Sequence, residues 1–207
     1  MDGRQILFVC TRIFCRILNN FVQGCTKQLL KITSMNDPKY PIGKFESATH
    51  FGAEDRSAAI EVIRSFPLLL QDLLEGVSGS DWERTYRPGS WNVAQLAHHL
   101  ADSHMNCFIR FKLALTEDTP TIKPYDENAW TRQEDYAKEL AQASVEISRG
   151  LHSRWSSLME SMSEGEWERS FFHPEQGKEV KLREALEYYS WHCRHHLKHI
   201  EIALNKG

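Results

Sequence analysis

The sequence lacks the features that would direct a chain into a membrane, into an oxidising compartment or onto a nucleic acid. A mostly apolar run near the N-terminus, residues 6–11, is too short to span a bilayer, and Arg12 and Arg16 prevent its extension toward the C-terminus. The five cysteines include no CxxC pair and no disulfide-like spacing, so we expect reduced thiols in a cytoplasmic protein. The formal net charge of −3 argues against a general nucleic-acid-binding protein.

The first 34 residues differ from the rest of the chain in charge and in histidine content. They contain five Lys or Arg and one acidic residue, whereas all ten histidines follow Met35. Apolar residues recur there at helical spacing, which fits a membrane-surface or targeting helix. It fits equally an extension translated from an upstream start, and we favour this second interpretation. We therefore expect one domain, with no membrane contact, over residues 35–207, and expect residues 1–34 to be dispensable.

Long strands are also missing from the pattern, because apolar and polar residues do not alternate over any length. Helical periodicity instead predicts four long helices, at residues 54–75, from an N-cap at Ser90 through Leu115, at 142–162 and at 182–204. Pro67 predicts a kink or a restart in the first of them. The segment "FFHPEQGKEVK" predicts a turn or short hairpin before the last helix. The fold class expected is all-α, a four-helix bundle with long connections.

A short repeat adds a suggestion about topology. The stretches "SDWERTY" and "GEWERSF" each lie between two of the expected long helices. Both stretches have Trp-Glu-Arg followed by a hydroxyl residue and an aromatic residue. Because each lies between two long helices, the repeat predicts two helical hairpins that face each other across the bundle.

Four histidines occur within eight positions of the last expected helix, in "YYSWHCRHHLKHIEI". His192 and His196 fall about 40° apart on a helix and one turn apart along it, so both imidazoles could bind one ion. His195 and His199 have the same spacing. The pattern alone does not choose between the two pairs, nor between a metal site and a hydrogen-bonded polar stripe.

A third histidine can come from the second expected helix, in "WNVAQLAHHLADSHMN". Periodicity puts His99 on the inward face with Leu100 and Cys107, and turns His98 outward. His104 is expected at the boundary of that face. Three further histidines stand alone and are expected to be structural or solvated: His50, His152 and His173.

Several ordered stretches together resemble the YfiT-type proteins of the DinB superfamily, which are described as metal-dependent hydrolases. They are "YPIGKFE", "GSWNVAQLAHHLADSHMNCFIRFKLALTED", "LHSRW" and "WHCRHHLKHI". The resemblance covers nearly everything from Tyr40 onward and implies a DinB-like four-helix bundle that forms homodimers. It implies one divalent metal ion per chain, held by His99 from the second helix and by His192 and His196 from the last.

Three imidazoles leave a tetrahedral ion with one open position, which is typical of a catalytic site. Zinc is the ion expected, and nickel also suits imidazole. The resemblance implies one of two activities on a small molecule: hydrolysis by an activated water, or transfer of a thiol such as bacillithiol to an electrophile. The third possibility is a metal-binding bundle without catalysis. The sequence identifies no catalytic residue, although Asn106 and Arg110 lie near the metal-binding face and could orient a substrate.

Overall fold

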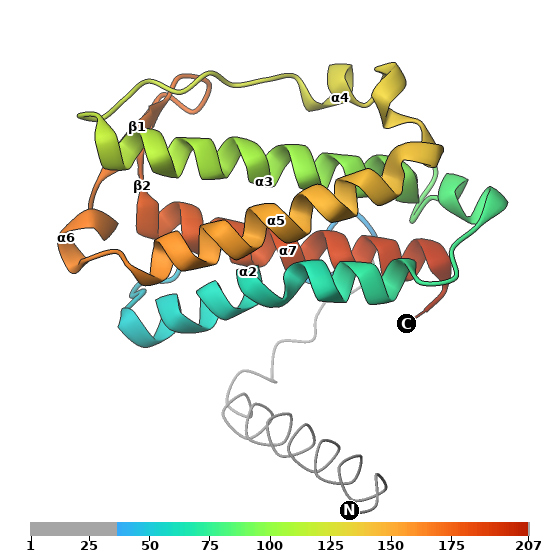
Figure 1. Ribbon diagram of the computed structural model, residues 1–207, viewed down its shortest axis with the longest axis horizontal. Coiled ribbons are helices and arrows are strands. Elements are labelled where there is room, and N and C mark those ends of the chain that lie inside the picture. The colour runs from blue at the N-terminus through green and yellow to red at the C-terminus, as the bar shows by residue number, and fades with distance from the viewer. Residues whose placement is uncertain (1–36, 207) are drawn as a thin grey trace, which may run out of the picture. The chain divides into compact units, whose positions relative to one another are not determined.

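The computed structural model describes residues 37–206, so the expectation for residues 1–34 lies outside the part of the chain described. Four long helices dominate it: α2 (Ala53–Leu74), α3 (Val93–Thr116), α5 (Ala141–Glu160) and α7 (Leu182–Leu204). Five shorter helical segments lie in the connections: η1 (Gly79–Glu83), α4 (Glu127–Trp130), η2 (Glu134–Tyr136), η3 (Lys138–Leu140) and α6 (Glu164–Trp167). The four-helix bundle predicted from periodicity is confirmed (Figure 1).

The short hairpin expected before the last helix is also present. Strands β1 (Ser170–His173) and β2 (Lys178–Lys181) pair antiparallel, with Phe171 opposite Val180. The turn between them ends at Gly177, whose φ of 62° is in the left-handed region that favours glycine. The hairpin delivers the chain directly into α7.

The order of the helices around the bundle differs from the two hairpins suggested by the repeat. Helix α2 packs against α5 and α7, and α3 packs against the same two helices. The order around the bundle is therefore α2, α5, α3, α7 (Figure 1). The two helices joined through each repeat lie diagonally opposite and do not pack as a hairpin, so the prediction of two helical hairpins that face each other across the bundle was wrong. The two repeated stretches form short helical turns, η1 and α6, at the two crossings, and the second stretch continues into β1 at Ser170.

The starts of the helices follow their local hydrogen bonds. Helix α3 begins after Asn92, whose side chain accepts from the amide of Gln95 at 2.8 Å and whose own amide donates back to the Gln95 side chain at 3.1 Å. The expected N-cap, Ser90, was wrong, because its hydroxyl donates to the Arg87 carbonyl at 2.9 Å in the preceding turn. Helix α2 neither ends nor restarts at Pro67 but continues through it.

The long connection from α3 to α5 returns along α3. Near its start the Ile122 amide donates to Phe172 of the hairpin at 3.1 Å, and further on the Gln95 side chain donates to the Thr131 carbonyl at 3.3 Å. Close to α5, the Tyr136 hydroxyl donates to Asp102 at 2.5 Å. This segment covers a side of α3 that the other long helices leave open.

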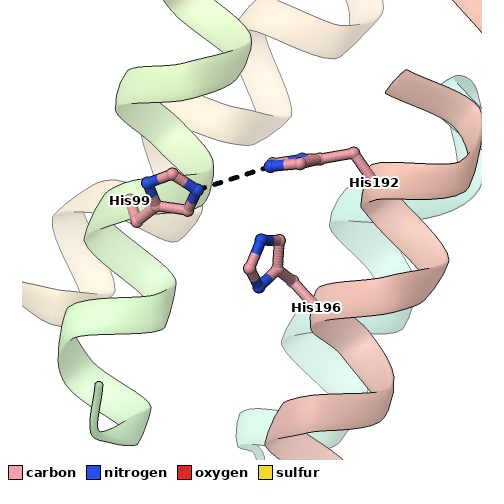
Figure 2. A group of neighbouring side chains, drawn as sticks. All are labelled: His99, His192 and His196. Carbon is pink, nitrogen blue, oxygen red and sulfur yellow. Dashed lines mark hydrogen bonds between the residues drawn. The ribbon is translucent and has the colours of Figure 1, made fainter. Parts of the chain in front are cut away.

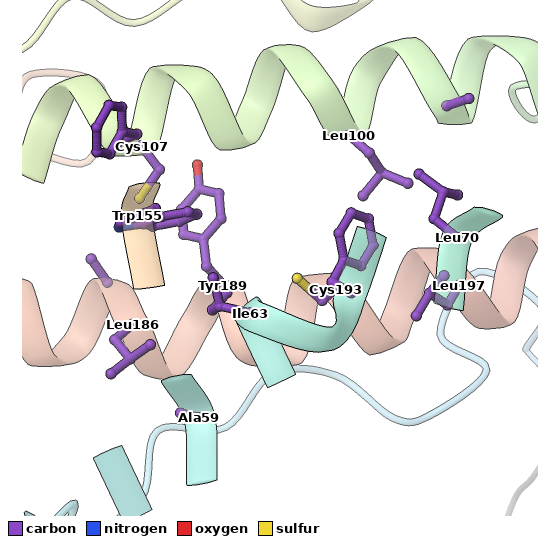
Figure 3. Packing of buried hydrophobic residues seen from close by; sticks show 14 of the residues in the cluster. Ala59, Ile63, Leu70, Leu100, Cys107, Trp155, Leu186, Tyr189, Cys193 and Leu197 are labelled. Carbon is purple, nitrogen blue, oxygen red and sulfur yellow. The ribbon is translucent and has the colours of Figure 1, made fainter. Parts of the chain in front are cut away.

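The core lies between the four helices and is filled by aliphatic and aromatic side chains from all of them (Figure 3). Trp155 of α5, Phe66 of α2 and Phe111 of α3 are completely buried. Burial of such large apolar side chains is the main source of stability in a bundle of this kind. Within residues 37–206, no helix has the length and apolar character needed to cross a membrane.

Candidate metal centre

Three histidines from two helices come together inside the bundle. His99 of α3 and His192 and His196 of α7 each offer one ring nitrogen, and these three atoms lie within 4.8 Å of one another. Their rings face a common space (Figure 2). Among the described residues this is the one group of histidine, cysteine or carboxylate side chains close enough to hold an ion.

The two helices fix this geometry through rigid backbone. His99 lies in the second turn of α3, just inside the cap formed by Asn92 and Gln95. His192 and His196 are one turn apart on α7, with ring centroids 4.5 Å apart. Because α3 and α7 are packed neighbours, the His99 ring meets the pair across the interface.

Burial keeps all three imidazoles in the neutral form that binds metal. It lowers the pKa of His99 to about 4. Burial also lowers the pKa values of His192 and His196 well below the ordinary value, and the neighbouring histidines lower them further. A neutral imidazole keeps a lone pair on one nitrogen, which is the form a metal ion requires.

The spacing of the nitrogens suits a small divalent ion. Zinc–nitrogen bonds of 2.0–2.1 Å at tetrahedral angles put two ligand nitrogens about 3.3 Å apart. Nε2 of His99 and Nε2 of His192 are 3.4 Å apart. Nδ1 of His196 lies 3.3 Å from Nδ1 of His199, which leaves Nε2 of His196 available to the shared space. The donor set and its spacing therefore fit a three-histidine site.

The alternative pair on α7, His195 and His199, does not belong to this group. The His195 ring stacks on Trp191, with centroids 4.3 Å apart. The His199 ring stacks on Tyr86, with centroids 3.7 Å apart. Both rings are buried in aromatic packing around the site.

Two sequence-based expectations about histidine exposure were wrong. His98 does point away from the three histidines, but it is buried, and its ring nitrogens contact the Ser144 hydroxyl at 2.8 Å and the Ala137 carbonyl at 3.1 Å. The connection before α5 covers it. His104, expected at a boundary, is completely buried, because α3 packs against two helices and so buries a wide arc of its surface. His104 contacts His152 and His192.

A cavity of about 370 Å³ adjoins the site, and His192 forms part of its wall. The charged side chains of the wall are Arg110 of α3, Glu127 of α4, Lys178 of β2 and Glu184 of α7. Arg110 forms no ion pair with any residue between 37 and 206. Burial raises the pKa of Glu127, and the nearby Arg110 partly opposes that rise. Asn106 is not part of this wall, and its side chain donates to the Asp102 carbonyl of its own helix at 2.9 Å.

The two cysteines of the described residues are buried free thiols. Burial raises the pKa of both Cys107 and Cys193, so neither thiol is poised to act as a nucleophile. Cys193 follows His192 in sequence, but it is not one of the three grouped side chains. Its sulfur lies 3.9 Å from Nε2 of His104.

Known proteins with this sequence pattern are named for metal-dependent chemistry. The family model of the DinB superfamily matches residues 67–200. YfiT of Bacillus subtilis (strain 168), provisionally named a metal-dependent hydrolase, is 40% identical over 177 residues, which are 85% of this chain and 99% of that protein. A protein of Oceanobacillus iheyensis with the same provisional description is 41% identical over 166 residues, covering 80% of this chain and 95% of its own length.

Solved structures agree with the fold. The solved structure of Bacillus subtilis YfiT, described as having an unusual four-helix bundle topology, superposes with a TM-score of 0.79 at 38% identity, over 83% of this chain and 99% of that one. A mycothiol-dependent maleylpyruvate isomerase superposes with a TM-score of 0.51 at 19% identity, over 68% of this chain and 60% of that one, which shows a shared fold alone. Since the family model spans most of the bundle and a relative 40% identical is covered almost completely, this chain belongs to the DinB superfamily.

Proposed function

We propose that this protein is a metal-dependent hydrolase in which His99, His192 and His196 hold one divalent ion. The observation that carries the proposal is the buried group of three neutral imidazoles whose ring nitrogens lie within 4.8 Å of one another, with Nε2 of His99 3.4 Å from Nε2 of His192. Zinc is the ion we propose, with nickel as the alternative, because both accept imidazole ligands. The provisional names of the relatives give the same reaction class.

A divalent ion with three imidazole ligands would keep one position open, where it would lower the pKa of a water molecule toward neutrality. The protein's own residues would then bind and orient the substrate. Because His192 forms part of the cavity wall, a small molecule in the cavity would lie beside the ion. The volume of about 370 Å³ suits a metabolite-sized substrate.

Arg110 is the residue we propose to orient that substrate, through an anionic group such as a carboxylate. Arg110 lies on the cavity wall near Glu127 but forms no direct ion pair with a carboxylate of the described residues. Asn106 is less suited than Arg110, since its amide is already donated to Asp102. Glu127, a carboxylate of raised pKa on the same wall, is the group we propose to accept a proton from the attacking water.

The homodimer and the cytoplasmic location expected from the sequence stay proposals. The first rests on the family resemblance. The second rests on the cysteine pattern, and the free thiols of Cys107 and Cys193 accord with a reducing compartment.

Hydrolysis of a panel of small esters and amides, with and without a carboxylate, tests the proposed function. We expect turnover that a chelator removes and added Zn²⁺ restores, with a preference for anionic substrates that Arg110→Gln abolishes. Turnover that survives complete metal removal would contradict the proposal. If no member of the panel is hydrolysed and thiols produce a sulfur-to-metal charge-transfer band in the cobalt-substituted protein, thiol transfer replaces hydrolysis as the proposed activity, and a thioether product formed with an electrophile would establish it.

A further inference from the structure

A continuous line of hydrogen bonds leads from the candidate metal centre across the bundle to α2. Nδ1 of His192 lies 3.2 Å from Nε2 of His104, and Nδ1 of His104 lies 2.8 Å from Nε2 of His152. Nδ1 of His152 lies 2.6 Å from the carbonyl oxygen of Ile63. The line thus joins side chains of α7, α3 and α5 to the backbone of α2, and all three rings are buried.

The Ile63 carbonyl determines which ring nitrogen of each histidine in the line is protonated. A backbone carbonyl can only accept, so the proton of His152 is on Nδ1 and its Nε2 carries a lone pair. That lone pair accepts from Nδ1–H of His104, which leaves Nε2 of His104 as an acceptor for Nδ1–H of His192. The ring of His192 then has its lone pair on Nε2, the atom 3.4 Å from Nε2 of His99. Each neutral ring has one proton, and all three hydrogen bonds run in one direction.

This assignment requires neutral rings in His104 and His152, and the burial of both rings favours the neutral form. Burial lowers the pKa of His152 to about 4. His104 is completely buried, and burial disfavours the charged form of an imidazole. The Cys193 sulfur lies 3.9 Å from the same Nε2 of His104, and a thiol can donate weakly to an unprotonated ring nitrogen, so this contact is compatible with the assignment.

The carbonyl of Ile63 is available because of Pro67. In an α-helix the carbonyl of residue 63 accepts from the amide of residue 67, but proline has no amide hydrogen. Helix α2 nevertheless continues through this position, and the freed carbonyl is the one that His152 contacts. A proline that would ordinarily weaken the helix therefore supplies the acceptor at the end of the line.

We propose that His104 and His152, anchored by the free carbonyl of Ile63, are positioning residues that fix the tautomer and orientation of His192 for metal binding. The inference rests on the proposed function, since it takes His192 as a metal ligand. Residues that hold a ligating histidine through its second nitrogen typically strengthen metal binding about 10- to 100-fold. The line ends at a buried carbonyl and not at solvent, so it orients the ligand and does not conduct protons out of the bundle.

The binding constant for Zn²⁺, measured by competition with a chelator, tests this role. His104→Leu removes both hydrogen bonds, and we expect it to weaken Zn²⁺ binding about 10- to 100-fold. His104→Gln should restore most of the affinity, because its amide oxygen can accept from His192 while its amide group donates to His152. His98→Leu is the matched control: it removes another buried, hydrogen-bonded histidine of α3 and should leave Zn²⁺ binding unchanged.

The proton positions can be measured without any variant. In long-range ¹H–¹⁵N spectra of the wild-type protein, His104 and His152 should both be protonated at Nδ1. Protonation of either ring at Nε2, or wild-type Zn²⁺ affinity in His104→Leu, would overturn the inference. An equal loss of affinity in His98→Leu and His104→Leu would overturn it too, since it would indicate a general loss of structure. Failure of the wild-type protein to bind Zn²⁺ would instead refute the proposed function.

Discussion

At the scale of single residues, the unusual feature of this bundle is the number of histidines that it buries in the neutral form. Burial lowers the pKa of His99 and of His152 to about 4. Between that value and the ordinary 6.5, the unfolded chain binds protons that the folded chain does not. The histidines therefore contribute stability above pH 6.5 that is lost as the pH falls toward 4.

The metal-free protein should accordingly be less stable at pH 5 than at pH 7. His152 alone, with its pKa lowered from 6.5 to about 4, accounts for a loss of about 2 kcal/mol over that interval. Urea unfolding in the presence of a chelator measures the free energy of unfolding at each pH. The difference between pH 7 and pH 5 should be smaller in His152→Gln than in the wild type. Equal stability at the two pH values would show that folding does not lower the pKa of these histidines.

The inward position of His99 could be predicted from helical periodicity, because it shares a face with completely buried Leu100 and Cys107. His104 and His98 could not be placed in the same way. A helix that packs against two neighbours and is also covered by a connection buries most of its circumference, so a single apolar face does not describe it. The contact from His104 to His192 joins positions 88 apart in sequence, and no local pattern contains it.

At the scale of the element, α2 and α3 support the site in different ways. Helix α3 fixes His99 through a capped first turn, a feature that the sequence carries in Asn92 and Gln95 although the cap was expected at Ser90. Helix α2 contributes no ligand. It contributes a carbonyl group, because Pro67 interrupts its hydrogen-bond ladder while the helix continues.

Pro67→Ala should separate stability from metal affinity. Alanine at position 67 has an amide N–H that can donate to the Ile63 carbonyl, as in an ordinary α-helix. Because proline in a helix interior costs roughly 3 kcal/mol, the free energy of unfolding should not fall. The restored amide would compete with His152 for the carbonyl, and Zn²⁺ affinity should decrease, by less than in His104→Leu. Thermal unfolding and chelator competition on the same sample measure both quantities. An unchanged Zn²⁺ affinity would show that the Ile63 carbonyl still holds His152 in place when it also accepts from the amide of residue 67.

At the scale of the whole molecule, the sequence predicted the number, type and extent of the long helices but not their order around the bundle. Periodicity defines one helix at a time, and the last helix has the predicted bounds, Leu182–Leu204. Which helices are neighbours depends on long connections, whose course periodicity does not contain. The diagonal connections make α3 and α7 neighbours, and this brings His99 to His192 and His196.

Elemental analysis of protein purified without chelator tests whether His99, His192 and His196 hold one metal ion per chain. We expect about one divalent ion per chain in the wild type, its loss in His99→Ala and His192→Ala, and its retention in His98→Ala, since the His98 ring is bound to Ser144 and Ala137 instead. A wild-type protein without metal, or a His98→Ala variant that loses the ion while His99→Ala keeps it, would show that these three histidines are not the metal ligands.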